Sequence, residues 1–149
     1  MPVPIPNLYP SFNTVRLSHA YLNVANLAAS KKFYTNILGM QISDETDTHI
    51  YLRAMEERGH HCIILQKSNQ PGTVEVMGFK TFDAADLDQA DAYFNSNGRP
   101  TSLVDRPYQG KPLLTSDTMA ISLDFYHNIH LRDLSRQSYA SDRSVHHLR

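Results

Sequence analysis

Short runs of alternating apolar and polar residues occupy most of the chain and predict strands. In the run 15–24 (VRLSHAYLNV), Leu17, His19 and Tyr21 share one face of the first predicted strand. Further runs rich in β-branched and aromatic residues predict strands over 40–42, 48–54, 60–66, 74–82, 101–104 and 119–126.

Two stretches between these runs have the spacing of amphipathic helices. The first covers 27–38, follows Asn26 as a favourable N-cap, and is followed by Gly39. The second begins after Asp86, which we expect to be its N-cap, and ends at Gly98. A glycine directly after a helix commonly adopts the left-handed conformation, so we expect a positive φ at both glycines.

The order of strands and helices repeats along the chain. Asn26 and Asp86 are 60 positions apart, and Tyr34 and Phe94 have the same separation. A repeat at this period indicates two copies of one supersecondary unit. Each copy consists of a strand, a helix and then two or three strands.

The two ends of the chain differ from this ordered middle. Residues 1–14 are too rich in proline for a helix or a central strand, so they predict an extended arm, either loose or packed on a partner. The stretch 131–149 is polar and predicts a tail or linker. A single module therefore spans 15–130.

Composition narrows the class of protein. The formal charge of −1 lacks the basic excess typical of nucleic-acid-binding domains. A lone cysteine, Cys62, excludes an internal disulfide, and we expect it to be a buried, inert thiol. No apolar run approaches the ~18 residues of a membrane span, and the N-terminus lacks a secretory pattern. We expect a soluble cytoplasmic protein with neither nucleic-acid nor membrane partners.

The run 19–39 (HAYLNVANLAASKKFYTNILG) carries a family resemblance. It resembles the opening of a vicinal oxygen chelate module, the superfamily of glyoxalase I, bleomycin and fosfomycin resistance proteins, and extradiol dioxygenases. Asn26 stands where that opening usually has aspartate. The resemblance implies an α+β fold of paired βαβββ motifs, in which the sheet curves into a half-barrel cup with the helices outside.

A second stretch, 50–65 (IYLRAMEERGHHCIIL), narrows the resemblance. It is similar to the N-terminal module of extradiol dioxygenases, particularly those that cleave catechol or homoprotocatechuate. In that family the C-terminal module carries the iron and the N-terminal module is usually metal-free. The resemblance covers about residues 15–130.

The resemblance also implies where a metal would be held. The equivalent points are His19, Ile64, Phe79 and Asp124. Imidazole and carboxylate bind divalent ions such as Fe(II), whereas Ile64 and Phe79 cannot ligate a metal. An extradiol site needs two histidines and one carboxylate. One imidazole is therefore missing, and we expect no tightly bound metal in this chain.

Aromatic side chains on the predicted strands suggest a ligand surface. Tyr21, Phe79 and Tyr126 are expected to line the cup, where a small aromatic, catechol-like ligand would bind. For His60 and His61 we expect a structural role at a turn or a contact with a partner module, because neighbours in a regular strand point to opposite faces and cannot share one metal.

Three functions stay open. The first is an extradiol-dioxygenase-like module of aromatic catabolism with an incomplete iron site. The second is a metal-free binding protein of the bleomycin-resistance type, and the third is a single-module glyoxalase-type metalloenzyme. Modules of this kind commonly pair, so we expect a homodimer. The run 145–148 (VHHL) resembles the start of another module, with His147 as its first iron ligand. The chain is thus either a fragment or a free-standing module.

Overall fold

One eight-stranded mixed sheet organises residues 5–131, the part of the chain that the computed structural model describes. The order of the strands is β2-β3-β4-β1-β5-β8-β7-β6. Their bounds are β1 (Thr14–Val24), β2 (Gln41–Glu45), β3 (His49–Arg53), β4 (Ile63–Lys67), β5 (Thr73–Thr81), β6 (Ser102–Leu103), β7 (Leu113–Ser116) and β8 (Ser122–Tyr126). Residues 1–4 lie outside the described residues. So does the predicted tail after Leu131, which includes His147.

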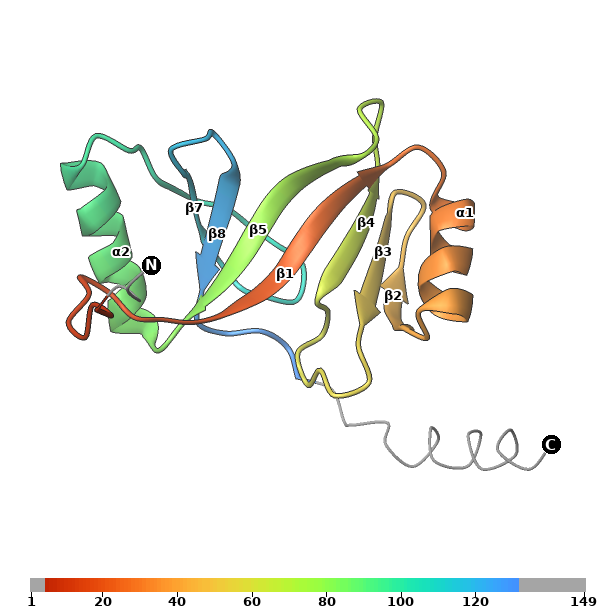
Figure 1. Cartoon of the computed structure of the whole chain (residues 1–149), viewed down its shortest axis with the longest axis horizontal. Coiled ribbons are helices and arrows are strands. Elements are labelled where there is room, and N and C mark those ends of the chain that lie inside the picture. The colour runs from red at the N-terminus through yellow and green to blue at the C-terminus, as the bar shows by residue number, and fades with distance from the viewer. Residues whose placement is uncertain (1–4, 132–149) are drawn as a thin grey trace.

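The sheet consists of two βαβββ units of the same topology. In the first unit β1 pairs with β4 in parallel, and in the second β5 pairs with β8 in parallel. The long strands β1 and β5 pair antiparallel at the centre and join the two units (Figure 1). The predicted α+β fold of paired units is confirmed. Strand β7 was not predicted from the sequence.

Each unit has a helical segment at its own end of the molecule (Figure 1). The first unit has α1 (Leu27–Lys32), which continues into the π-helix η1 (Phe33–Ile37), and the second has α2 (Ala84–Ser96). The predicted helix over 27–38 therefore widens in its second half. No helix among residues 5–131 is long and apolar enough to span a membrane.

The helix ends test the predicted caps. Asn26 caps α1, since its Oδ1 accepts a hydrogen bond from the Ala29 N–H at 3.0 Å. Gly39 and Gly98 both have φ 71°, so both predicted left-handed positions are confirmed. The cap of α2 is Asp83 rather than Asp86, because the Asp83 side chain accepts from the Asp86 N–H. The prediction for Asp86 was wrong by one helical turn.

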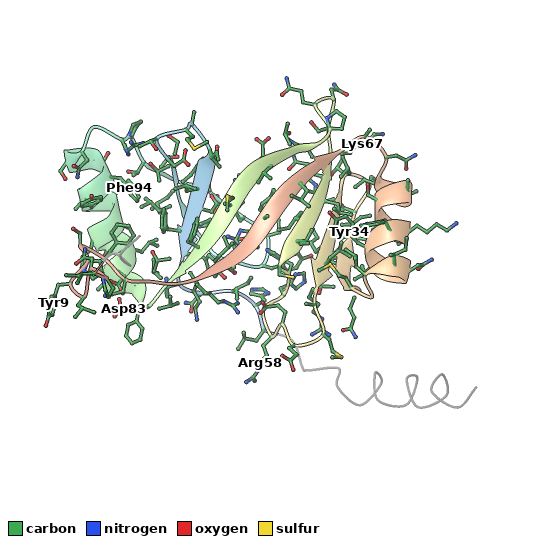
Figure 2. All side chains as sticks on the ribbon, in the orientation of Figure 1. Tyr9, Tyr34, Arg58, Lys67, Asp83 and Phe94 are labelled. Carbon is green, nitrogen blue, oxygen red and sulfur yellow. The ribbon has the colours of Figure 1, made fainter. Side chains whose placement is uncertain are left out.

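The outer face of the sheet is apolar beneath both helical segments. Under α1 and η1 the buried residues are Ile50, Leu52 and Leu65. On the other side, Leu113 and Phe125 of the sheet pack in one cluster with Ala90 of α2. Tyr34 and Phe94 lie on the sides of their helices that face the sheet and pack against these clusters (Figure 2).

The described end of the N-terminal arm packs on its own module. The Phe12 ring lies 5.5 Å from the ring of Phe125 and 5.6 Å from that of Phe94, centroid to centroid. The Asn13 N–H donates to Oδ1 of Asp86 at 2.8 Å. Phe12 thus packs against the core around α2, the exposed Asn13 is hydrogen-bonded to α2, and β1 begins at Thr14.

Candidate functional site

The inner face of the sheet carries a polar cluster at its centre. We call this face the cup and define it by His19, Tyr21, Ile64, Val76 and Asp124, all of which are buried. Tyr21, Ile64 and Val76 form its apolar floor together with Tyr51. Strands β1, β4, β5 and β8 each contribute to it.

A bulge in β1 turns two successive side chains toward the cup. The pairing between β1 and β5 shifts between Leu17 and His19, and both Ser18 and His19 are buried. Ser18 forms a hydrogen bond with the Tyr126 hydroxyl. The His19 ring lies directly over Gly78, since a Cβ at that glycine would come 2.1–2.4 Å from the ring atoms. This position therefore requires glycine.

Asp124 flanks the same glycine from the other side. It pairs with Gly78 in the ladder between β5 and β8, and its side chain is fully buried. One carboxylate oxygen, Oδ2, accepts a hydrogen bond from Nε of Arg106 at 3.1 Å. The other oxygen, Oδ1, has no hydrogen-bond partner among the described residues. Neither ring nitrogen of His19 has one, so no hydrogen bond joins His19 to Asp124.

Arg106 comes from the segment between β6 and β7, which crosses behind β5 and β1 (Figure 1). Its guanidinium carbon lies 4.9 Å from the centroid of the Tyr21 ring, a distance at which a cation and an aromatic face attract. Arg106 is thus held by a carboxylate and an aromatic ring, both inside the cup.

Burial dominates the protonation equilibria of the cluster. It lowers the pKa of His19 to about 3, with further lowering from the charges of His61 and Arg106. Burial raises the pKa of Asp124, and Arg106 opposes that rise. Burial likewise raises the pKa of Tyr21. His19 is therefore neutral at physiological pH, and Arg106 is the cation that faces Asp124.

The same segment fills the rest of the cup. The Tyr108 ring stacks on the His60 ring at 3.7 Å and meets the Tyr51 ring edge-on at 5.2 Å. Its hydroxyl donates to the Asp44 carboxylate. The backbone of Tyr108 has φ 69°, a conformation that costs a non-glycine residue about 1–2 kcal/mol and persists only where the surroundings hold it.

His60 and His61 lie in the turn before β4 and both are buried in this packing. Their Nδ1 atoms are 3.1 Å apart, and His61 Nε2 is 3.3 Å from Oε1 of Gln109. Burial, together with the charge of His60, lowers the pKa of His61 to about 4. Because the pair precedes the strand, strand alternation does not separate the two rings.

Phe79 does not face the cup, contrary to the prediction. Its ring stacks on Phe125 at 5.6 Å, in the cluster under α2. In the ladder, Ile64 pairs with Tyr21, and Asp124, the equivalent of Ile64 in the second unit, pairs with Gly78. Gly78 is therefore the repeat equivalent of Tyr21, and the β5 counterpart of His19, two residues earlier, is Val76, 57 positions away rather than 60. Tyr21 and Tyr126 are buried near His19, at centroid distances of 5.8 and 5.5 Å.

The residues of the cup do not fit a divalent metal. Among residues 5–131 no three histidine, cysteine, aspartate or glutamate side chains lie close enough together to hold one ion. Val76 and Ile64, on the cup strands β5 and β4, are aliphatic and offer no donor atom. Of the two candidate ligands, Asp124 already forms an ion pair with Arg106.

Four surface cavities lie outside the cup. All four are formed by the described residues 5–131. One, of about 430 Å³, lies beside the end of β1, and another, of about 310 Å³, lies beside α2. His19, Tyr21 and Asp124 line none of these four. The cup is instead occupied by Arg106, Tyr108 and Gln109, which sequence reasoning missed because their segment shows only polar and turn-forming residues.

Comparisons with known proteins agree with this architecture. The family model described as Glyoxalase/Bleomycin resistance protein/Dioxygenase superfamily matches residues 16–111. Metapyrocatechase from Pseudomonas sp. (strain CF600) is 31% identical over 70 residues, which are 46% of this chain and 22% of the relative.

Solved structures of homoprotocatechuate 2,3-dioxygenase resemble the chain over most of its length. A variant enzyme from B. fuscum superposes with a TM-score of 0.82 at 28% identity, over 90% of this chain and 38% of the other. The anaerobic complex of the Brevibacterium fuscum enzyme with 3,4-dihydroxyphenylacetate gives the same TM-score and identity, over 90% and 43%. The chain thus spans less than half the length of these relatives. It belongs to the glyoxalase/bleomycin resistance protein/dioxygenase superfamily, and its fold is that of the extradiol dioxygenases.

Proposed function

We propose that this chain is an extradiol-dioxygenase-type module of aromatic catabolism that holds no iron of its own and works beside an iron-carrying module. The observation that carries the proposal is the ion pair between Arg106 and the fully buried Asp124, with Nε and Oδ2 3.1 Å apart. The carboxylate that could ligate a metal is already neutralised by a side chain of the same chain.

The chemistry of ring cleavage supports this assignment. Fe(II) in extradiol enzymes needs two histidines and one carboxylate, so that positions for catechol and dioxygen stay open on one face of the ion. Here the β5 counterpart of His19 is Val76, which has no donor atom. Two candidate ligands, one of them already paired, would hold Fe(II) too weakly for turnover.

The packing of the cup favours this module over the two alternatives. A binding protein of the bleomycin-resistance type needs an open groove, whereas Tyr108 and Gln109 occupy this cup and contact His60 and His61. A glyoxalase-type enzyme needs more metal ligands than His19 and Asp124. The catechol-like substrate of the proposed enzyme would therefore bind on the iron-carrying module.

The partner module follows from the same proposal. We propose that this chain pairs either with a second, iron-carrying module or with a copy of itself, because modules of this fold commonly complete one another. Sedimentation-velocity ultracentrifugation of the purified chain tests the second arrangement. A dimer at micromolar concentration is expected, and a monomer would leave only the first arrangement.

Metal analysis with an activity assay tests the proposal. The chain is purified without chelators, reconstituted anaerobically with Fe(II), desalted and assayed for oxygen uptake with catechol and 3,4-dihydroxyphenylacetate. We expect far less than one iron per chain and no yellow ring-fission product. One tightly bound iron per chain that is lost in His19→Ala, or rapid oxygen uptake with either catechol, would overturn the proposal.

A further inference from the structure

A carboxylate that is fully buried and ionised needs a cation beside it. An isolated buried charge is so costly that carboxylates in protein interiors are protonated, paired or bound to a metal. Asp124 has no exposed surface, and Arg106 is the ion-pair partner that the described residues provide. The neighbouring imidazole of His19 contributes no positive charge, since burial keeps it neutral.

Arg106 is half-buried against two side chains of the cup. The side chain is 24% exposed, its Nε contacts Asp124, and its guanidinium lies over the Tyr21 ring. Planar guanidinium groups suit this combination of carboxylate and aromatic contacts better than a lysine ammonium does. The geometry therefore fixes a permanent positive charge beside the two side chains that could ligate a metal, His19 and Asp124.

We infer that Arg106 is the resident cation of this site: it occupies the place of a divalent ion, neutralises Asp124 and excludes metal. The inference deepens the proposed function and rests on it. Both ring nitrogens of His19 and Oδ1 of Asp124 have no hydrogen-bond partner among the described residues, and all three are atoms that can ligate a metal. Two potential ligands thus survive in the cup, and the arginine keeps them from acting as such.

The contact distance suggests how the exclusion could be reversed. Adjacent ligand atoms around an ion with ligand bonds of about 2.1 Å lie about 3 Å apart at a right angle. Nε of Arg106 and Oδ2 of Asp124 are 3.1 Å apart, which matches that separation. A histidine at position 106 would place a ring nitrogen near Nε, and with His19 and Asp124 it would complete two imidazoles and one carboxylate.

Metal binding by the 149-residue chain is the first test. Co(II) titrations, followed by visible absorption, compare the wild type with Arg106→His, Arg106→Gln and the double variant Arg106→His/Asp124→Asn. We expect Arg106→His to bind Co(II) at least tenfold more tightly than the wild type, and the double variant to lose that gain. Arg106→Gln removes the cation without adding a ligand, so its gain should be smaller. A folded Arg106→His that binds no more tightly overturns the inference.

A double-mutant cycle is the second test and does not depend on a new metal site. Arg106→Met should lower the urea midpoint, because it leaves the Asp124 charge buried without a partner. Adding Asp124→Asn should recover most of that loss, and strictly additive shifts would overturn the inference. The outcomes of the two proposals can be told apart. One iron per chain in the wild type would overturn the proposed function. A metal-free wild type in which the effects of Arg106→Met and Asp124→Asn on the urea midpoint are additive would overturn only the role of Arg106.

Discussion

The two faces of the sheet bury different kinds of side chain. The outer face, under α1, η1 and α2, is covered by aliphatic and aromatic side chains whose burial stabilises the fold. The cup buries imidazoles and a carboxylate beside a half-buried guanidinium, and several polar atoms there lack hydrogen-bond partners among the described residues. Unpartnered buried polar atoms cost stability, so we assign the stability of the module to its outer face.

The largest effect is expected on the outer face. Phe125→Ala should lower the free energy of unfolding by about 3–5 kcal/mol, because it removes a ring that Phe12, Phe79 and Phe94 contact. Urea denaturation measures the change. Phe82→Ala is the matched control, since this ring is 71% exposed and should change stability by less than about 0.5 kcal/mol. Equal effects of the two substitutions would contradict the assignment of the core.

A smaller but more specific effect is expected in the cup. Gly78→Ala should cost about 1–3 kcal/mol, because the new methyl group would overlap the His19 ring. The double variant Gly78→Ala/His19→Ala should be more stable than the sum of the single changes predicts, since the ring that clashes is gone. Urea denaturation of all four proteins measures this coupling. Additive free energies would show that His19 does not lie over Gly78.

Stability should also fall in mild acid because of the buried His61. Its folded pKa is about 4 against an ordinary value of 6.5, so between these values the unfolded chain binds a proton that the folded chain does not. The free energy of unfolding therefore carries no penalty from His61 above pH 6.5. It decreases as the pH falls toward 4, by at most about 1.4 kcal/mol per pH unit.

Urea denaturation from pH 7.5 to 4.5 measures that slope. His61→Gln should show a shallower slope, while it keeps a polar group beside Gln109. His127→Gln, which changes a histidine that is not buried, is the control. The same slope in wild type and His61→Gln would assign the acid sensitivity to other groups, with the buried His19 first among them.

Local signals in the sequence were enough for most of the fold. The cap at Asn26 and the glycines at 39 and 98 depend on contacts within a few residues, so the local sequence is enough to predict them. The error at Phe79 has a physical cause: the repeat spacing holds between β4 and β8, but the ladder between β1 and β5 sets a spacing of 57. Periodicity alone does not reveal such a shift.

The polar partners of the cup were beyond sequence reasoning for a different reason. Arg106 and Asp124 are 18 positions apart, and Tyr108 and Asp44 are 64 apart. Such contacts depend on how a segment without regular structure folds back over the sheet, and no local pattern encodes that path. His19 and Asp124 could be named from a family resemblance, but the cation that pairs with Asp124 could not.

The smallest effect is expected at a glycine far from both faces of the sheet. Gly98 follows α2 with φ 71°, and a Cβ there would meet no atom within 4 Å. Gly98→Ala should therefore lower the free energy of unfolding only by the cost of a left-handed backbone at alanine, about 1 kcal/mol. Gly78 lies at an ordinary φ but under a ring, so the two glycines separate conformational from steric cost. In urea denaturation, His19→Ala should rescue Gly78→Ala and leave Gly98→Ala unchanged. If His19→Ala restored stability at both positions, it would stabilise the module generally. That result would contradict the claim that Gly78 is required because the His19 ring lies over it.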